Sequence, residues 1–369
     1  MRTLMRWFGL LLGLVLLVAA AAALVVFNSP QVQDEIFSRV AKSTMGQTQD
    51  ALMADDALRA VVCGSSSPFP DARRAKACIA IIAGGKIYFV DTGPQSYSRV
   101  ALLRLPVGSI GGIFLTHFHS DHIADLGEFN MNSWILGRTA PMDVYGPPGV
   151  ERVVAGFSEA YALDQTYRTA HHGADVANSE LWKMIAHPIA LPGEITAAHD
   201  RTAVVLDDGA LKVTAIEVNH EPIEPAYGYR FDYKGRSIVI SGDTIKHMPL
   251  AAAAQGADVL FHEAQAQHMV IALQESARAS NNKRFTKIMG DIQNYHTSPV
   301  EAAEIANKAG VKLLVLYHLT PTVANMLTER MFVRGVAEAR KGDWLLSKDG
   351  TIVELPLNAK DAVHVSDAF

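Results

Sequence analysis

Short apolar runs that end in polar residues recur along most of this chain. Such runs have the length of β-strands, and a Gly-Gly turn between Ile79–Ala83 and Lys86–Val90 predicts a hairpin. Helical stretches separate the runs, such as Pro299–Lys308 with Ser298 as N-cap. This alternation predicts an α/β or α+β fold. The runs that end in Asp or His are Lys86–Val90 before Asp91, Ile110–Leu115 before Thr116-His117, Leu211–Val218 before Asn219-His220, Ser237–Ile240 before Ser241-Gly242-Asp243, and Lys312–Leu316 before Tyr317-His318.

The N-terminus carries the longest uncharged apolar segment. Arg2 and Arg6 precede a run from Trp7 to Phe27, which as a helix is about 31 Å long and can cross a bilayer. Arginines before such a run keep the N-terminus in the cytoplasm and export the rest of the chain. We predict a signal-anchor, with a signal peptide cleaved near Ala19–Ala23 or a buried core helix as alternatives. The first two place the remaining chain on the periplasmic side of the inner membrane, anchored, or secreted.

The amino-acid composition excludes several classes of protein. Of the 369 residues, 49% are hydrophobic, which excludes global disorder, and the net charge of −5 does not indicate a basic nucleic-acid surface. The net charge does not exclude a local basic patch. Cys63 and Cys78 are too few for a cysteine scaffold or an all-cysteine zinc site. In an exported protein they form a disulfide or remain two free buried thiols.

The strongest chemical signal is the segment Thr116-His117-Phe118-His119-Ser120-Asp121-His122, which follows an apolar run. Side chains two positions apart in extended chain point the same way, so His117 and His119 can grip one cation. Asp121 and His122, after the chain turns, can reach a second cation beside the first. Imidazole and carboxylate ligands suit Zn²⁺, with Mn²⁺ or Fe²⁺ as alternatives.

Other His and Asp residues that can bind metal follow further apolar runs. The ends of several strands of one sheet can converge on one site. We expect two ions, since two metals about 3.5–4 Å apart acidify a bridging water and clamp the attacking and leaving oxygens. Asp243 has two oxygens and can bridge both ions. The expected sets are His117, His119 and His220 on one metal, and Asp121, His122 and His318 on the other, with Asp243 shared.

These motifs resemble the metallo-β-lactamase superfamily, and the finer features are similar to its ribonuclease Z and arylsulfatase-like branch. The resemblance covers roughly residues 58–350 and implies an α+β fold, an αβ/βα sandwich. β-Lactamases of this superfamily commonly have Cys at the position of Asp243, so Asp there argues against β-lactam hydrolysis. The motifs similar to the branch are Gly64-Ser-Ser-Ser-Pro68 with Arg73 and Arg74, Val90-Asp-Thr-Gly93, Tyr145-Gly-Pro-Pro-Gly149, Ser241-Gly-Asp-Thr244, His262-Glu-Ala264 and His296-Thr-Ser298.

The resemblance also implies catalytic roles. His296 would lie beside the scissile group, where it donates a proton or binds the anionic centre, with helix capping as the alternative. Glu263 would hold that imidazole in one tautomer, or else be a solvated or salt-bridged carboxylate. Asp121 would act as general base besides its ligand role. Asp91 would orient a ligand histidine, or simply occupy a turn.

The leading functional hypothesis is an exported dinuclear zinc hydrolase, arylsulfatase-like, that cleaves a sulfate or phosphate (di)ester by attack of a metal-bridging hydroxide. The alternative is a ribonuclease Z-type tRNA 3′-processing endonuclease or phosphodiesterase. The membrane segment, the net charge and the lack of a Lys/Gly-rich arm in Phe157–Ala190 oppose it. Lactone or thioester hydrolysis, and a metal-stabilised binding module, are further alternatives.

The predicted organisation has a signal-anchor or signal peptide at 1–30 and a membrane-proximal linker at 31–57, helical over Gln33–Lys42. The hydrolase domain spans 58–350, with an insertion or cap at 157–190, and a C-terminal tail spans 351–369. The expected partners are a small anionic ester and the membrane, with nucleic acid disfavoured and a homodimer left open.

Overall fold

The computed structural model describes residues 2–46, 48–192 and 201–368. It divides into two units, Met1–Thr48 and Gln49–Phe369, which are treated separately. The first contains α1 (Arg2–Asn28) and α2 (Pro30–Thr44), so the helix expected over Gln33–Lys42 is confirmed. Ser29 caps α2 by accepting from the backbone N–H of Val32. Met5–Asn28 is long and apolar enough to cross a membrane, a test that a signal sequence also satisfies.

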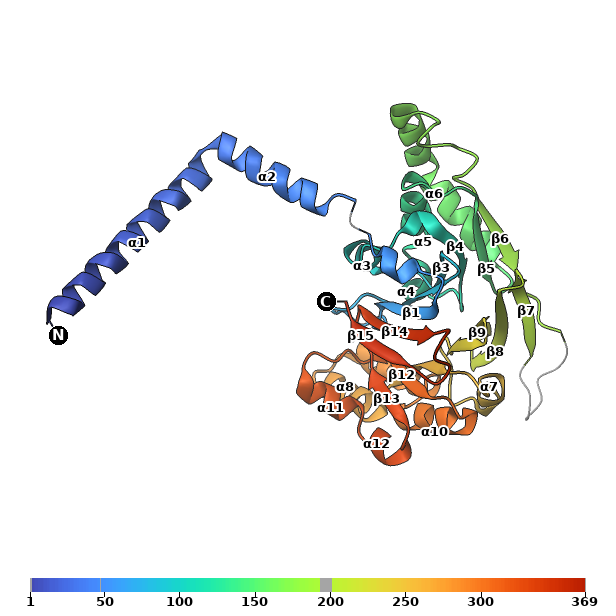
Figure 1. The fold of residues 1–369 in the computed structure, drawn as a ribbon. Helices are drawn as coiled ribbons and strands as arrows, with labels where there is room; N and C mark the ends of the chain where they lie inside the picture. The colour runs from blue at the N-terminus through green and yellow to red at the C-terminus, as the bar shows by residue number, and fades with distance from the viewer. Residues whose placement is uncertain (1, 47, 193–200, 369) are drawn as a thin grey trace. The chain divides into compact units, whose positions relative to one another are not determined.

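The second unit contains two β-sheets (Figure 1). The first follows the order β15-β14-β1-β2-β3-β4-β5-β6 and the second the order β13-β12-β11-β10-β9-β8-β7. The first sheet comprises β1 (Ala57–Gly64), β2 (Cys78–Ala83), β3 (Lys86–Val90), β4 (Ile110–Phe114), β5 (Met142–Gly146), β6 (Met184–Pro188), β14 (Thr351–Pro356) and β15 (His364–Asp367). The second comprises β7 (Thr202–Asp207), β8 (Leu211–His220), β9 (Ile223–Tyr233), β10 (Arg236–Ile240), β11 (Val259–Gln265), β12 (Leu313–Thr320) and β13 (Asp343–Leu346).

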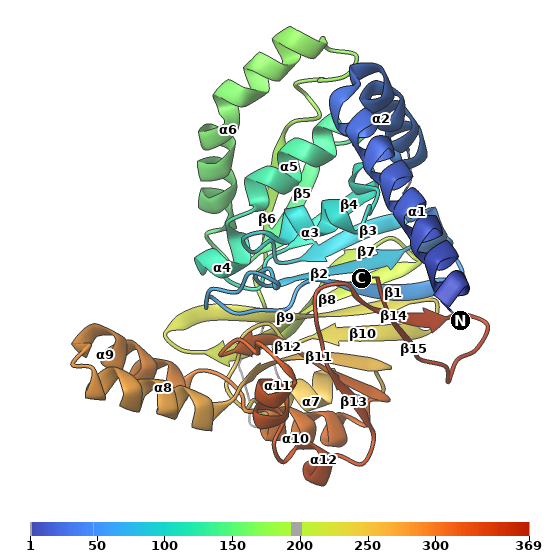
Figure 2. The same cartoon turned by 90° about the vertical axis from the view of Figure 1, so that its left-hand side faces the viewer.

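Helices cover the outer face of each sheet (Figure 2). Those on the first sheet are α3 (Ser96–Leu102), α4 (Ser120–Ile123), α5 (Leu126–Ile135) and α6 (Val150–His172). The second sheet carries α7 (Met248–Ala253), α10 (Pro299–Ala309), α11 (Met326–Phe332) and α12 (Val336–Ala339), while α8 (Gln267–Ala279) and α9 (Lys283–Asp291) form a protruding hairpin. The layers run helices, sheet, sheet, helices, which confirms the expected αβ/βα sandwich.

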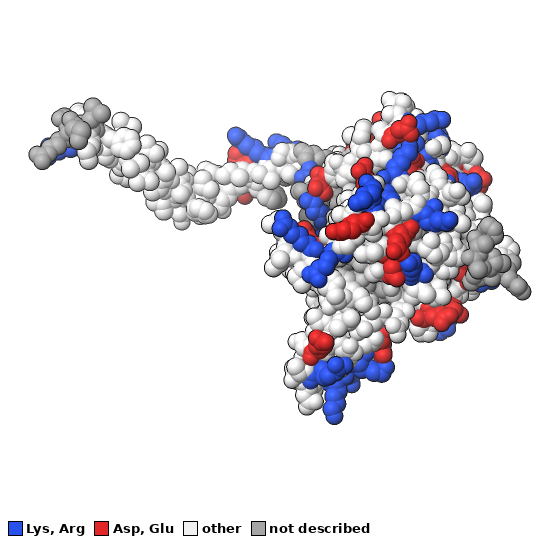
Figure 3. Space-filling model, turned by 90° about the horizontal axis from the view of Figure 1, so that it is seen from below, with Lys and Arg blue, Asp and Glu red and all other residues white. Residues whose placement is uncertain are grey.

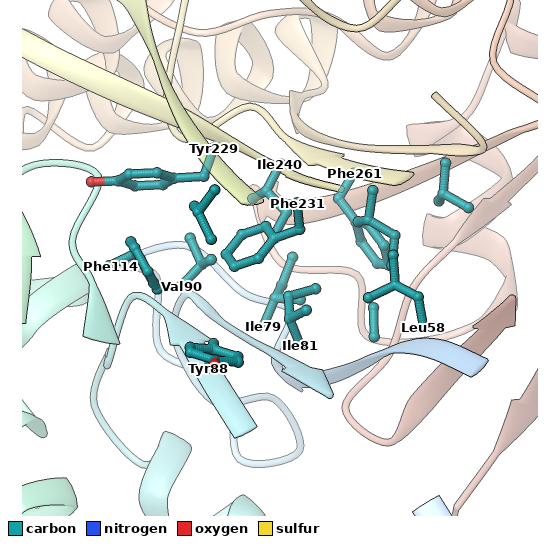
Figure 4. Packing of buried hydrophobic residues seen from close by; sticks show 14 of the residues in the cluster. Leu58, Ile79, Ile81, Tyr88, Val90, Phe114, Tyr229, Phe231, Ile240 and Phe261 are labelled. Carbon is teal, nitrogen blue, oxygen red and sulfur yellow. The ribbon is translucent and has the colours of Figure 1, made fainter. Parts of the chain in front are cut away.

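Alternation along the strands divides the apolar residues between two cores. In β1, Ala60 and Val62 face the second sheet, where Phe231 and Phe261 meet them in one cluster (Figure 4). The intervening Val61 and Cys63 belong to a cluster with residues of α3, α5 and α6. Every residue of β1 is buried, as expected for a strand covered on both faces.

Cys63 and Cys78 form a disulfide between the adjoining ends of β1 and β2. Of the two alternatives left by the sequence, the structure therefore contains the bonded one. The bridge closes the loop between the two strands, and this loop contacts the second sheet near His318.

Two expected boundaries differ from the structure. The segment 157–190 is only in part a helical cap: α6 begins before it, at Val150, and β6 is an edge strand paired with β5. The sequence concealed this strand because Met184–Pro188 is short and lies at the sheet edge. Residues 351–369 are not a tail, since β14 pairs with β1 and β15 with β14.

We expect Phe231→Ala to destabilise the Gln49–Phe369 unit by about 3–5 kcal/mol, because it leaves a cavity between the sheets. Phe231 is fully buried and its ring lies 5.5 Å from that of Phe114. Urea unfolding measures the loss. Val204→Ala on β7 is the control; Val204 is 56% exposed, and its change should stay within about 0.5 kcal/mol. Equal losses would contradict the packing described.

Candidate metal centre

The predicted ligands meet at one edge of the sandwich, at the left of Figure 2. They come from strand ends of both sheets and from one helical turn. The structure brings together His117 and His119 after β4, Asp121 and His122 in α4, His220 at the end of β8, Asp243 after β10, and His318 within β12.

Three histidines form one half of this cluster. Ligand-type atoms of His117, His119 and His220 lie within 4.8 Å of one another, and Nε2 of His117 is 2.9 Å from Nδ1 of His119. Nδ1 of His220 lies 3.0 Å from the carbonyl oxygen of Tyr295. A carbonyl can only accept, so Nδ1 carries the proton and Nε2 presents a lone pair. Burial lowers the pKa of His220 to about 4, which keeps the ring neutral, as a metal ligand must be.

Asp121, His122 and His318 form the other half. Nε2 of His318 is 3.2 Å from Oδ2 of Asp121 and 3.2 Å from Nε2 of His122. Asp243 lies between the halves, because its Oδ2 is 3.3 Å from Nε2 of His122, 3.4 Å from Nε2 of His318 and 3.9 Å from Nε2 of His220. A single carboxylate can therefore serve both halves.

Unsatisfied buried atoms test whether this cluster fits metal ions. Oδ1 of Asp243 and Nε2 of His220 are buried and have no hydrogen-bond partner. Buried polar atoms are normally paired, so two orphaned ligand atoms that converge with other ligands indicate a cation site. Neutral imidazoles and carboxylates are ligands suited to Zn²⁺, Mn²⁺ or Fe²⁺. The residues present therefore fit divalent cations of this kind.

Asp91 fixes the orientation of His122. Its Oδ2 lies 2.7 Å from Nδ1 of His122, and both its oxygens accept from Thr116, through the backbone N–H and the hydroxyl. The sequence left a plain turn aspartate as the alternative, and these contacts exclude it. Burial opposes charge on His122, but Asp243, Asp91 and Asp121 outweigh it and raise its pKa well above the usual value.

Local backbone geometry aims two of the ligands. His318 has φ +47° and forms a bulge, because Glu263 and Ala264 of β11 pair with Tyr317 and Leu319. A bulge re-aims a side chain that regular alternation would place elsewhere. Asp243 follows Gly242, which has φ +63°; a Cβ there would lie 2.4 Å from the carbonyl oxygen of Tyr227.

The loop closed by the disulfide supports the strand behind His318. The backbone N–H of Leu319 donates to the carbonyl oxygen of Ser65, and the hydroxyl of Ser67 donates to the carbonyl oxygen of Leu319. Asp349 in turn accepts from both the backbone N–H and the hydroxyl of Ser65. The first sheet therefore holds a ligand of the second sheet in place.

His296 and Glu263 form a buried pair beside the ligands. Nδ1 of His296 is 3.1 Å from Oε1 of Glu263, which also accepts from the backbone N–H groups of Thr297 and Thr244. Burial opposes a charge on His296, but Glu263 raises its pKa above the usual value. Glu263 is fully buried, so a solvated carboxylate is excluded, whereas the salt-bridged alternative agrees with its pairing with His296. Helix capping is also wrong for His296, because Ser298 caps α10.

Sequence reasoning missed two parts of the site. Tyr295 orients His220 through its carbonyl group, and its ring stacks on His296 at 4.6 Å. Its position next to His296 was the available signal. A hollow of 240 Å³ opens beside His117 and His119, and its lining includes Pro147-Pro148 and the first residues of β9. Nothing in the sequence pattern indicated that these two segments face each other.

Comparison with known proteins identifies the family. A model of the β-lactamase superfamily domain matches residues 87–319, which include all seven predicted ligands. The chain belongs to the metallo-β-lactamase superfamily. Its fold in this superfamily, with the clustered His and Asp residues, makes the protein a metal-dependent hydrolase of ester bonds.

The relatives of this superfamily member refine the comparison. It is 33% identical to ribonuclease Z of Mycobacterium sp. (strain KMS) over 270 residues, 72% of this chain and 86% of the relative. Ribonuclease Z of Mycolicibacterium gilvum (strain PYR-GCK) is 31% identical over 269 residues, 72% of this chain and 85% of the relative. The expected ribonuclease Z-like branch is thereby confirmed.

Solved structures agree with the fold. The short form of human tRNase Z superposes with a TM-score of 0.56 at 19% identity, covering 81% of this chain and 99% of that one. The metallo-β-lactamase fold protein YhfI from Bacillus subtilis gives 0.55 at 19% identity, with 81% and 100% covered. At these identities the likeness concerns the fold alone.

We expect Asp91→Asn to weaken zinc binding about 10- to 100-fold, because His122 loses the carboxylate that fixes its tautomer. Chelator competition measures the affinity. Asp143→Asn is a matched control, since Asp143 also lies 2.7 Å from a histidine, His187, but at a partly exposed place away from the ligands. The assignment would be refuted by equal weakening in both variants.

Proposed function

We propose that this protein is a dinuclear metal-dependent phosphodiesterase or arylsulfatase-like hydrolase that cleaves a small phosphodiester or sulfate ester outside the cytoplasm. The observation that carries the proposal is the position of Asp243 between two sets of ligands. His117, His119 and His220 would hold one ion, and Asp121, His122 and His318 the other. Such a pair, with Asp243 shared, is the arrangement used for in-line displacement at phosphorus or sulfur.

The two ions, when bound, would acidify a water and offset charge on the attacked ester. Asp121 is suited to receive a proton from that water and also to remain a ligand. Burial opposes its ionisation, but His122 and His318 lower its pKa to about 2, so it is a carboxylate at neutral pH.

His296 is suited to protonate the leaving group. Its Nδ1 proton faces Glu263, and its raised pKa favours a second proton on Nε2. In the hydrolysis, the water oxygen bonds to phosphorus or sulfur while the bond to the leaving oxygen breaks. The electron pair departs with that oxygen, which takes the proton of His296, and the water proton passes to Asp121.

Two features support a location outside the cytoplasm. The helix α1 carries Arg2 and Arg6 in its first turns and is otherwise uncharged, as in an anchor that leaves the N-terminus inside. The Cys63–Cys78 disulfide is typical of an oxidising compartment.

Processing of tRNA 3′ ends is the second candidate, because the curated relatives are named ribonuclease Z. A local basic patch also favours it: the α8–α9 hairpin carries Arg278, Lys283, Arg284 and Lys287, and Lys and Arg gather at the tip of the lower lobe in Figure 3. The hollow beside the ligands opposes it, since its described lining includes Glu224 and no Lys or Arg.

A substrate comparison tests the proposal on the zinc-loaded full chain in a nonionic detergent. We expect methyl 4-nitrophenyl phosphate to be hydrolysed with a higher kcat/KM than 4-nitrophenyl sulfate, which has the same leaving group. Chelation should abolish turnover and added zinc should restore it, while Asp121→Ala should stay inactive.

A preference for sulfate would make the enzyme arylsulfatase-like. Trimming of a tRNA precursor would favour the second candidate, and no turnover of either small ester with both ions bound would refute the proposal.

His296→Ala should lower kcat about 10²- to 10⁴-fold for an alkyl leaving group, and much less for 4-nitrophenolate, which leaves without a proton. The raised pKa of His296 gives the sign of the pH dependence. Wild-type activity on the alkyl ester should fall as pH rises through that pKa, and the variant should lack this alkaline limb. His268→Ala, at an exposed position of α8, is the control. The same loss for both leaving groups would exclude proton donation.

A further inference from the structure

Apolar groups contribute much of the lining of the hollow beside the predicted metal ligands. The lining includes His117 and His119, and also Phe118, which lies between them in the sequence. Pro148, which follows β5, and Ile223 and Pro225, at the start of β9, also line it. With a volume of 240 Å³, the hollow can hold an aromatic ring, and an apolar group placed there touches the reacting centre at one end.

The hollow continues outward along the same wall. A second hollow of 400 Å³ shares Phe118 and Pro148 with the first and extends to Arg152 and Val153 of α6. Phe118 is half-buried, so one side of its ring is available for contact. The two hollows therefore form one groove that leads away from the ligands over an aromatic and a proline face.

The negative charge in the first hollow, the one beside His117 and His119, comes from one side chain. Among its described lining residues, Glu224 is the one that carries a carboxylate, and it is exposed at the rim. No Lys or Arg lines this hollow in the part of the chain that the structure describes. A carboxylate close to the reacting centre repels a leaving group that carries its own negative charge.

We propose that this hollow binds the leaving group of the ester, and that it selects an uncharged aromatic group. Phe118 and Pro148 supply the contact surface, and Glu224 excludes a leaving group with a further negative charge. This inference rests on the proposed function and names its substrate class, an aryl ester. An RNA trailer, which carries phosphates, is a poor match to the same hollow.

Three aryl methyl phosphates test the inference, with phenyl, 2-naphthyl and 4-carboxyphenyl leaving groups. The three phenols have similar acidity, so the breaking bond is comparable and the differences report on binding. The wild-type chain in detergent should prefer 2-naphthyl over phenyl about five- to tenfold in kcat/KM, because more apolar area is buried. Phe118→Ala should reduce this ratio to below about twofold. Phe285→Ala on α9, outside both hollows, should leave the ratio unchanged.

Glu224 is tested by the charged leaving group. The wild type should prefer phenyl over 4-carboxyphenyl about three- to tenfold, and Glu224→Gln should remove most of that preference. Glu221→Gln is the matched control, since Glu221 lies in the turn just before β9, is exposed like Glu224 and also precedes a proline, yet is not among the residues that line the hollow. This second variant keeps the test decisive if Phe118→Ala fails to fold.

Binding separates this inference from the proposed function. Calorimetry should show that the zinc-loaded chain binds 2-naphthylphosphonate more tightly than phenylphosphonate, with the ratio lost in Phe118→Ala. If no ester is hydrolysed but this ratio holds, the proposed function fails and the aromatic site stands. If the esters are hydrolysed while neither Phe118→Ala nor Glu224→Gln changes any ratio, the aromatic site is overturned and the function stands.

Discussion

The structure of the site depends on one constraint: several carboxylates are buried together with histidines around Asp243. Three carboxylates, Asp91, Asp121 and Asp243, are buried within reach of His122. Burying charges is costly unless they are paired or coordinate metal. Asp91 is compensated by Thr116 and His122, whereas Oδ1 of Asp243 has no partner. The surrounding fold therefore keeps in place an arrangement that becomes favourable when cations enter.

Much of the site could be predicted because its residues end strands. The period of side chains in extended chain places His117 and His119 together, and convergence of strand ends accounts for His220 and Asp243. The position of His318 follows from a bulge with positive φ, which no periodicity reveals. The burial of Glu263 depends on backbone donors at Thr244 and Thr297, far away in the sequence.

The sandwich itself was predictable from alternating apolar runs, but its edges were not. β6, β14 and β15 are short or half-exposed, so their residues show little of the pattern that marks the central strands. Their assignment depends on neighbours: β14 completes the sheet because β1 offers an unpaired edge. The hollow beside the predicted ligands is a similar case, since its lining comes from the start of β9 and from the segments that follow β4 and β5. Pairing between distant segments leaves little local trace in sequence.

The superfamily supports several chemistries on one set of ligands, so the groups around the ions decide the substrate. Here the polarity and charge of those groups differ between two neighbouring parts of the surface. The hollow next to His117 is apolar with one carboxylate, while the basic side chains lie on the α8–α9 hairpin. The relatives are named for an RNA-processing activity, yet the described lining of the hollow next to His117 has no Lys or Arg, and a cation first enters the groove farther out, at Arg152.

The seven ligands divide between the halves of the chain. His117, His119, Asp121 and His122 follow the first sheet, whereas His220, Asp243 and His318 belong to the second. Neither half contains either of the predicted ligand sets, and the hydrogen bond from Leu319 to Ser65 ties the two sheets together. Metal binding therefore requires both halves of the chain to be correctly associated. If the chain were cut in the connection between β6 and β7, the amount of bound metal would report the fraction of fragments that had reassembled in the correct register.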